Sequence, residues 1–344
     1  MSGDFRDTLL LPFENGTLAG PQPGVAGSER WLGVNISDWP ASASEWGDVL
    51  ICVQSARGAS LDLSAQGFQT SPDWQSALEK APDGGFQGAL IMPSRARRLN
   101  EANFARAWNA TRIGGVIAFA GDKTSGVQSM RKWVGKQANI AGTLSKNHAQ
   151  VFWAMRTGDA LSVPDIRDPI DQFETDAGMF SAGKIDPGSR LLADMFDHRI
   201  TGKVADLGAG WGYLSHRLLA ASPNVEACHL YEHDHASLQA AQRNVSDPRA
   251  QFHWCDIPRE VASGPPERPF DWVIMNPPFH TTRAADPSLG QAFLKAAAGA
   301  LPKGGRMLMV ANRNLPYERL LSELFTRTEL RADQAGYKVI FAVR

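Results

Sequence analysis

The second half of the sequence alternates between short apolar runs and amphipathic segments, and this feature constrains the fold more than any other. Apolar runs predict strands at 203–207, 225–232, 251–255, 270–275, 306–311 and 338–343, and the segments between several of them predict helices at 213–221, 236–244 and 288–301. Strands that alternate with helices form a mostly parallel, doubly wound sheet covered on both faces. The sequence therefore predicts an α/β fold, in which ligands bind at the carboxyl ends of the strands.

The first half of the sequence resembles a degenerate copy of the second half. Residues 86–94 can be aligned with 270–278, residues 114–117 with 304–307, and residues 151–154 with 340–343. A segment with two prolines and alternating charge, 163–169, is a candidate linker between the halves. Because 344 residues exceed the usual size of one domain, we predict two tandem domains of the same α/β fold, at residues 1–165 and 166–344.

Composition excludes several classes of protein. A hydrophobic fraction of 43% is ordinary for a globular protein, and no apolar run approaches the roughly 18 residues that span a bilayer. The N-terminus lacks the basic and apolar segments of a secretion signal. The three cysteines, Cys52, Cys228 and Cys255, have neither a paired count nor metal-ligand spacing. We therefore expect a cytoplasmic, monomeric protein with reduced thiols, no bound metal and no membrane partner.

Charge is distributed unevenly along the chain. Ten Lys or Arg residues lie between Arg95 and Lys146, and only Glu101 and Asp122 oppose them, so this window carries +8 and the rest of the chain −9. A local positive surface of this kind attracts a phosphate backbone. Ordinary solvated helix faces explain the same charges equally well, so charge alone does not decide between the two.

A glycine-rich run follows the first predicted strand of the second half. Asp206-Leu-Gly208-Ala-Gly210-Trp-Gly212 has its third glycine one position earlier than the dinucleotide-binding fingerprint requires. The run instead resembles the S-adenosylmethionine loop of class I methyltransferases, in which Asp206 would hold the loop and the methionine amino group. At the ends of the next two strands, Glu232 is placed to accept the ribose hydroxyls and Asp256 to accept the adenine amine. A single acid is more often a helix cap, but three acids at consecutive strand ends favour a ligand site.

The run Asn276-Pro277-Pro278-Phe279-His280 follows the apolar strand at 270–275. Two prolines restrict the backbone here, which either simply ends the strand or builds a rigid pocket floor. Such a pocket suits a flat group with an amine, because the Asn276 side-chain oxygen and the Pro277 carbonyl accept hydrogen bonds and Phe279 offers a face for stacking. For His280 a structural role as a cap is favoured over proton transfer. In the first half Met92 aligns with Asn276, so the copy lacks this polar group.

Together with residues 178–192, 311–317 and 336–339, the Asn-Pro-Pro-Phe-His run resembles the bacterial ribosomal RNA guanine-N2 methyltransferases, of the small-subunit methyltransferase C type. The resemblance implies two Rossmann-like class I methyltransferase domains, with a degenerate N-terminal one that recognises RNA. It also implies transfer of a methyl group from S-adenosylmethionine to the 2-amino group of a guanosine in ribosomal RNA, with the small subunit favoured. Asn276, Pro277 and Phe279 would be catalytic. Asn276, Phe180, Ser181 and Asp186 would contact the cofactor, although core packing is an equal alternative for Phe180.

Two other classes of function remain open at this point. A related enzyme could methylate a large-subunit guanine, adenine or cytosine in DNA, or a glutamine amide in a protein, since all present an amine to an Asn-Pro-Pro-aromatic pocket. A non-catalytic RNA-binding factor of ribosome assembly is the other alternative. It is disfavoured because the loop and the pocket are both intact in the second half.

Overall fold

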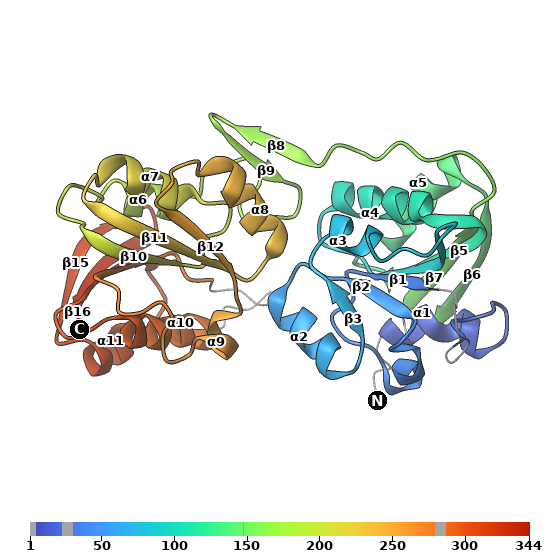
Figure 1. Ribbon diagram of the computed structural model, residues 1–344, viewed down its shortest axis with the longest axis horizontal. Coiled ribbons are helices and arrows are strands. Elements are labelled where there is room, and N and C mark those ends of the chain that lie inside the picture. Colours follow the sequence, from blue (N-terminus) through green and yellow to red (C-terminus); the bar gives the residue numbers. More distant parts are fainter. Residues whose placement is uncertain (1–4, 23–29, 147, 279–286) are drawn as a thin grey trace. The chain divides into compact units, whose positions relative to one another are not determined.

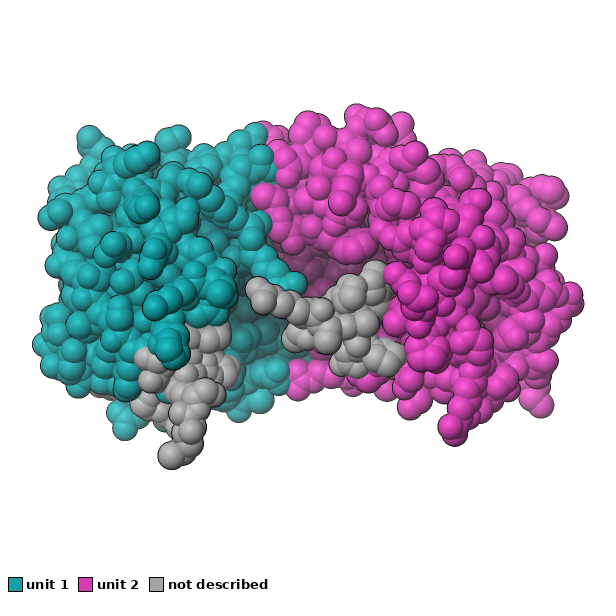
Figure 2. All heavy atoms as spheres, turned by 180° about the vertical axis from the view of Figure 1, so that it is seen from behind, with its two compact units in different colours: residues 1–166 teal, residues 167–344 magenta. Residues whose placement is uncertain are grey.

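A computed structural model of the 344-residue chain describes residues 5–22, 30–146, 148–278 and 287–344 (Figure 1). The chain divides into two compact units, unit 1 with residues 1–166 and unit 2 with residues 167–344 (Figure 2). Each unit contains a seven-stranded sheet, and the boundary falls between Ile166 and Arg167.

The sheet of unit 2 has the strand order β12-β11-β10-β13-β14-β16-β15. Its first five strands in this order are parallel, whereas β16 runs antiparallel to both β14 and β15. The chain therefore builds outward from β10 to β12 and returns to β13 on the other side of β10, which makes the gap between β10 and β13 a topological switch point. The strands are β10 (Gly202–Leu207), β11 (Val225–Glu232), β12 (Ala250–Trp254), β13 (Trp272–Met275), β14 (Arg306–Asn312), β15 (Arg327–Gln334) and β16 (Tyr337–Val343).

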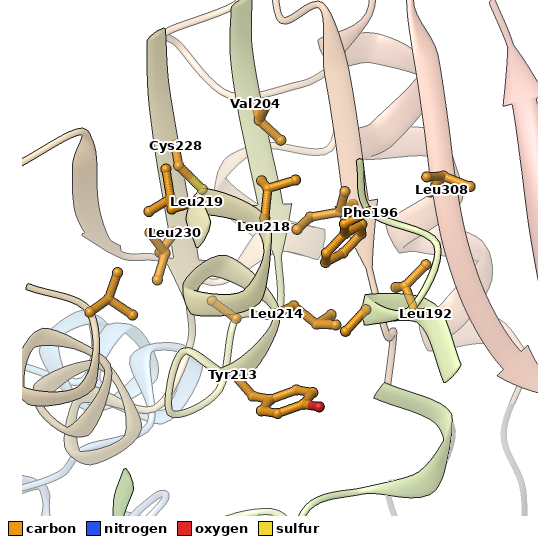
Figure 3. Packing of buried hydrophobic residues seen from close by; sticks show 14 of the residues in the cluster. Leu192, Phe196, Val204, Tyr213, Leu214, Leu218, Leu219, Cys228, Leu230 and Leu308 are labelled. Carbon is orange, nitrogen blue, oxygen red and sulfur yellow. The ribbon is translucent and has the colours of Figure 1, made fainter. Parts of the chain in front are cut away.

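Helices cover both faces of this sheet, as Figure 1 shows. On one face lie α6 (Pro187–Ala193), α7 (Tyr213–Ala221) and α8 (His235–Asn244), and on the other α9 (Ile257–Glu260), α10 (Pro287–Ala300) and α11 (Glu318–Leu324). Each face has its own apolar core. Figure 3 shows the first of them, where Leu192 of α6 and Leu214 and Leu218 of α7 pack with Val204 and Leu230 of the sheet.

Unit 1 repeats this topology, with the strand order β3-β2-β1-β4-β5-β7-β6. The first five strands are again parallel and the β5–β7 and β6–β7 pairs antiparallel, so the prediction of two doubly wound, mostly parallel sheets is confirmed. The elements are α1 (Phe5–Glu14), β1 (Trp31–Val34), the 3-10 helix η1 (Ala41–Trp46), β2 (Leu50–Val53), α2 (Arg57–Ala65), β3 (Gln69–Ser71), α3 (Trp74–Leu78), β4 (Phe86–Ile91), α4 (Arg97–Ala110), β5 (Thr111–Asp122), α5 (Val127–Gln137), β6 (Ile140–Lys146) and β7 (Ala149–Met155).

The strand registers of the two sheets show which residues occupy matching positions. Since β1 pairs with β2 and β4 as β10 pairs with β11 and β13, Gly33 matches Asp206, Asn35 matches Gly208 and Gln54 matches Glu232. Met92 follows β4 as Asn276 follows β13. Unit 1 thus keeps the fold but has no acidic group at the positions of Asp206 and Glu232 and no amide at the position of Asn276.

The registers also correct one part of the internal alignment. Residues 114–117 match 304–307 as predicted, but Phe152 matches Ile340, so the alignment of 151–154 with 340–343 is wrong by one residue. A shift of one residue would turn each side chain of the strand to the opposite face of the sheet. Both segments are almost continuously apolar, so the sequence pattern alone does not fix their register.

The predicted linker is partly a strand. Residues 167–170 form β8 (Arg167–Ile170), which pairs antiparallel with β9 (Phe173–Asp176) in a small separate sheet of unit 2. The cysteines are buried and form no disulfide. Within the described residues, we find no helix with both the length and the apolar character needed to cross a membrane.

Candidate active site

The glycine-rich loop leaves the carboxyl end of β10 beside the switch point. Gly208, Gly210 and Gly212 all have left-handed φ angles, 80°, 56° and 90°, which other residues rarely adopt. The backbone N–H groups of Gly208 and Ala209 donate to the carbonyl of Tyr231 at 2.9 and 3.1 Å. Gly212 caps α7, and a Cβ there would come within 2.8 Å of the Val245 side chain. The loop is therefore a tight turn into a helix, as the sequence predicts.

Glu232 lies at the end of β11 and is only 5% exposed. Its Oε2 accepts from the Gly210 N–H at 2.7 Å, and its Oε1 accepts from the Asp234 N–H at 2.9 Å and lies 2.8 Å from Nδ1 of His233. Burial alone would raise the pKa of this carboxyl, but the hydrogen bonds from His233 and from the two backbone N–H groups outweigh it and hold the pKa below its ordinary value. An ionised carboxylate therefore lies directly against the glycine-rich loop.

Asp206 occupies a different environment, within the sheet beneath the loop. It is fully buried, and its Oδ2 accepts from the Ser215 hydroxyl of α7 at 2.7 Å. Burial raises the pKa of Asp206 to about 7 despite this hydrogen bond, and the neighbouring Glu232 carboxylate adds to the increase. Its Oδ1 is buried and has no hydrogen-bond partner among the described residues. The contact of Asp206 with the methionine amino group stays a prediction.

Asp256 follows β12 and is half-buried at the N-cap position of the four-residue helix α9. Its side chain makes no capping bond to that helix. Because Glu232 pairs with Trp254 in the register of β11 and β12, Asp256 lies two residues beyond the end of the strand next to Glu232, at the same edge of the sheet.

Asn276 follows β13 on the other side of the switch point. Its Nδ2 donates to Oδ2 of Asp186 at 3.0 Å and to Oγ of Ser189 at 2.8 Å, so both amide hydrogens are used inside the protein. Its Oδ1 accepts no hydrogen bond from the part of the chain that the structure describes, which leaves it as the acceptor for a ligand. Pro277 is buried next to it, whereas Phe279 and His280 lie outside the described residues.

Asp186 is fixed by its own contacts. It is 9% exposed and is the N-cap residue of α6, where its Oδ2 accepts from the Ser189 N–H at 2.8 Å. The Tyr337 hydroxyl of β16 lies 3.5 Å from the other carboxylate oxygen. The structure therefore brings Asp186 to Asn276. The contact of Asp186 with the cofactor stays a prediction.

The segment before α6 reaches the glycine-rich loop. The carbonyl of Phe180 accepts from the Trp211 indole N–H at 3.2 Å, and the Phe180 side chain is 61% exposed, so it does not pack in the core. Ser181 follows with a left-handed φ of 56°, in a turn closed by the Lys184 N–H. Phe180 and Ser181 thus lie beside the loop, with the ring of Phe180 open to solvent.

Two residues that help to assemble the site were missed by the sequence analysis, Asn244 and Ser189. The Asn244 side chain bonds to the backbone N–H and carbonyl of Glu174 and to the carbonyl of Trp211, each at 2.9 Å, and so ties β9 to the loop. These contacts join residues 33 to 70 positions apart. The sequence carries a local signal only for the start of α6, because Asp186-Pro-Gly-Ser189 is a typical helix N-terminus with proline in its first turn.

The donor and acceptor groups of the site fit S-adenosylmethionine. Glu232 would supply a buried, ionised acceptor for a ribose diol, and the half-buried Asp256 at the next strand end would supply an acceptor for an amine. The glycine-rich turn allows close approach of a ligand to the backbone.

A different group of side chains, His229, His253 and Glu267, brings potential metal-ligand atoms within 4.8 Å of one another, but the two imidazoles already bond to each other at 3.1 Å.

Fold and site together define a class I methyltransferase that depends on S-adenosylmethionine. Residues 171–341, which make up nearly all of unit 2, match the model of the methyltransferase small domain. The chain is 35% identical over 168 residues to the ribosomal RNA small subunit methyltransferase C of Hamiltonella defensa, a match that spans 49% of each chain. It is 26% identical over 274 residues to the protein of the same name from Idiomarina loihiensis, over 75% of this chain and 78% of that protein.

A solved structure resembles the whole chain. The T. thermophilus 16S rRNA N2 G1207 methyltransferase (RsmC), in complex with AdoMet and guanosine, is 26% identical, with a TM-score of 0.78 over 99% of this chain and 91% of that one. The likeness includes unit 1, so the predicted arrangement of two methyltransferase-like domains is confirmed for the full length.

Proposed function

We propose that the protein transfers a methyl group from S-adenosylmethionine to the exocyclic 2-amino group of a guanosine in ribosomal RNA. Of the two ribosomal subunits, we favour the RNA of the small subunit as the substrate. The observation that carries the proposal is the orientation of Asn276, whose amide hydrogens are bound by Asp186 and Ser189 while its oxygen is left for an amine. The relatives support the class of substrate, since they are named as ribosomal RNA methyltransferases and the solved structure contains guanosine.

The chemistry requires an acceptor pair rather than a nucleophile. The lone pair of the guanine 2-amino nitrogen is delocalised into the ring, so this nitrogen is a weak nucleophile. In the proposed mechanism Asn276 Oδ1 and the Pro277 carbonyl accept its two N–H groups, and the nitrogen becomes pyramidal with its lone pair turned to the reaction partner. When bound, S-adenosylmethionine supplies the electrophilic methyl group. The residues contribute positioning and stabilisation of the positive charge that develops on nitrogen. As the carbon–nitrogen bond forms, the carbon–sulfur bond would break and a neutral thioether would leave, and the nitrogen would then release one of its two protons to water.

A base inside an RNA helix cannot reach such a pocket, so the guanosine must be unpaired or turned out of its stack. We assign the stacking contact to Phe279, which lies outside the described residues. The cofactor contacts proposed for Asp206, Gly208, Gly210, Gly212, Glu232 and Asp256 place the nucleoside of the cofactor along the strand ends from β10 to β12. Phe180, Ser181 and Asp186 would border the methionine end, next to Asn276.

We assign RNA binding to residues 1–165 and catalysis to residues 166–344. Unit 1 has Gln54 and Met92 where unit 2 has Glu232 and Asn276, which leaves it without the cofactor and amine ligands. A cavity of about 310 Å³ at the matching strand ends is lined in part by Asn35, Gln54 and Met92. Most of the basic residues between 95 and 146 are exposed, where a phosphate backbone can reach them; these are Arg95, Arg97, Arg112, Lys123, Lys132, Lys136 and Lys146. A monomer acting in the cytoplasm on ribosomal RNA fits this division of roles.

The test is methyl transfer followed by nucleoside analysis. The purified full-length protein is incubated with S-adenosylmethionine carrying an isotope-labelled methyl group and with small-subunit RNA, large-subunit RNA or the assembled subunits. After digestion, mass spectrometry should find labelled N2-methylguanosine in the small-subunit samples. Label on another base, or on a ring nitrogen of guanine, would refute the assignment of the amine. Binding of S-adenosylmethionine without transfer to any of these substrates would refute the proposed catalytic role in ribosomal RNA.

A further inference from the structure

We propose that Ser189 is a positioning residue of the methyl-transfer reaction, which acts by locking the side-chain amide of Asn276 in the orientation that presents its oxygen to the substrate amine. This inference rests on the proposed function and specifies how its acceptor is built. Ser189 does not itself touch the reacting atoms in the proposal. It acts through Asn276, 87 residues away in the sequence.

Among the helix starts that the structure describes, three share the same capping sequence, and the comparison shows what is unusual about Ser189. In each, an aspartate is the N-cap residue and accepts from the N–H of a serine three positions later, at the starts of α3, α6 and α8. In α3 the Ser76 hydroxyl also bonds back to its own cap Asp73 at 2.8 Å, and in α8 the Ser237 hydroxyl bonds back to Asp234 at 2.8 Å. Such a return bond is local and serves the helix.

In α6 the serine hydroxyl bonds to a residue outside the helix. The Ser189 N–H still donates to Asp186, so the helix keeps its cap, but Oγ accepts from the amide of Asn276 at 2.8 Å. Within the described chain the Ser189 hydroxyl makes no return bond to Asp186 like those of Ser76 and Ser237. Helix capping is therefore complete without this hydroxyl, and its contact is with the residue that binds the amine.

The surroundings hold this hydroxyl in place. Ser189 is 8% exposed and Asp186 9%, and Gly188 between them packs against Tyr337. A Cβ at Gly188 would come within 2.6 Å of the Tyr337 ring and 3.1 Å of Oδ2 of Asp186, so only glycine lets α6 start this close to β16. The Ser189 hydroxyl and the Asp186 carboxylate thus form a rigid pair of acceptors.

A rigid pair of acceptors matters because the two ends of an amide have nearly the same shape. If the Asn276 side chain turned over, its NH2 group would face the NH2 group of guanine, and two donors cannot bond to each other. The Asp186 carboxylate accepts one amide hydrogen and would repel an amide oxygen in its place, and the Ser189 hydroxyl, which can accept or donate, accepts the second amide hydrogen. With both acceptors present, only one orientation satisfies all groups, and it is the orientation with the oxygen toward the substrate.

The experiment compares Ser189→Ala with Ser189→Thr in the full-length protein. Removal of the hydroxyl should lower the single-turnover rate of N2-methylguanosine formation by roughly 10- to 100-fold, less than the loss of a whole oriented donor or acceptor because Asp186 still holds one amide hydrogen. S-adenosylmethionine affinity should stay within about threefold of the wild type, and Ser189→Thr should restore most of the rate, since both follow from a hydroxyl that acts on amide orientation alone. Ser237→Ala is the matched control, because it removes the same capping serine hydroxyl elsewhere in unit 2 and should leave the rate near that of the wild type.

A double-mutant cycle shows whether Ser189 acts through Asn276. In an Asn276→Ala background, Ser189→Ala should cause no further loss, because there is no amide left to orient. Additive losses, a wild-type rate in Ser189→Ala, or a rate loss explained by weaker cofactor binding or by a lower melting temperature than that of Ser237→Ala would each overturn the inference. Absence of N2-methylguanosine with the wild-type protein would instead refute the proposed function, so the two failures are distinguishable.

Discussion

Replacement of Glu232 by glutamine isolates the contribution of one carboxylate to cofactor binding. In the structure Oε2 of Glu232 accepts the Gly210 N–H and has a second lone pair for a ribose hydroxyl, whereas Oε1 already accepts the Asp234 N–H and lies 2.8 Å from Nδ1 of His233. A glutamine keeps one acceptor oxygen and replaces the other by an NH2 group. One ribose hydroxyl and one backbone N–H therefore lose their acceptor.

The size of the effect follows from the charge of the lost acceptor. A hydrogen bond to a charged group contributes about 1.5 to 3 kcal/mol, which corresponds to a 10- to 150-fold weaker affinity for S-adenosylmethionine. The fold itself should tolerate the change, because Gln54 occupies the matching position of unit 1, where its Oε1 accepts from the Ala56 N–H at 3.0 Å and its Nε2 donates to the carbonyl of Ile36 at 2.7 Å. A loss of affinity without loss of folding is therefore expected.

Isothermal titration calorimetry with S-adenosylmethionine measures this affinity, and denaturant unfolding checks the fold. Glu226→Gln is the control, since it removes one negative charge from an exposed position on the same strand β11. It should leave the affinity unchanged. An affinity of folded Glu232→Gln within threefold of the wild type would show that this carboxylate does not bind the ribose, and the assignment of the loop and strand ends would fail with it.

Three further changes test other parts of the structure. Gly188→Ala should lower the free energy of unfolding by about 1 to 3 kcal/mol, because the added methyl group overlaps the Tyr337 ring. Asp206→Asn should remove a pH dependence of the free energy of unfolding. The pKa of Asp206 is raised to about 7 in the folded protein, so this carboxyl ionises at a lower pH in the unfolded chain. The wild type therefore loses stability as pH rises from 4 to 7. The stability of the variant relative to the wild type should therefore increase by about 2 to 3 kcal/mol between pH 5 and pH 8, as measured by urea unfolding. Binding of ribosomal RNA should weaken as salt rises, and Lys132→Gln and Lys136→Gln should each reduce the slope of log affinity against log salt by up to about 1.

Each of these expectations has a clear contrary result. A Gly188→Ala protein as stable as the wild type would show that α6 can move away from β16, while Gly158→Ala, where a Cβ meets no atom within 4 Å, serves as the neutral comparison. A constant stability difference between Asp206→Asn and the wild type over that pH range would mean that this carboxyl titrates normally in the folded protein. Unchanged salt slopes in both lysine variants would place the RNA contact away from α5.

The sequence predicted most of unit 2 because its buried strands are continuous apolar runs. The helix at 213–221 and the strand at 225–232 have the bounds that the structure shows, and other predicted elements differ at their ends by one or two residues. Strand β15 (Arg327–Gln334) was missed because it lies at the edge of the sheet, is mostly exposed and has a charged residue at every second position instead of an apolar run. The hairpin of β8 and β9 was read partly as a linker, since Pro169 lies within β8 and only Phe173 and Thr175 of β9 are buried.

The site was predictable where its residues follow strands and unpredictable where they meet through space. The positions of the loop, Glu232, Asp256 and Asn276 at the strand ends follow from parallel topology alone. The contacts of Asn276 with Asp186 and Ser189 join segments about 90 residues apart, and no local pattern indicates them. The resemblance suggested a cofactor contact for Asp186, which stays a prediction, and the structure shows that Asp186 is a helix cap that also accepts from the Asn276 amide.

The central claim is that the Asn276 amide oxygen binds the amine that is methylated. Its most direct test is the single-turnover rate of N2-methylguanosine formation on small-subunit RNA by Asn276→Ala, with S-adenosylmethionine affinity measured on the same preparation. Loss of a positioned polar group in a closed site costs roughly 100- to 1000-fold in rate, so a loss of this size with cofactor affinity within about threefold of the wild type is expected. A variant that methylates guanosine at the wild-type rate would contradict the account.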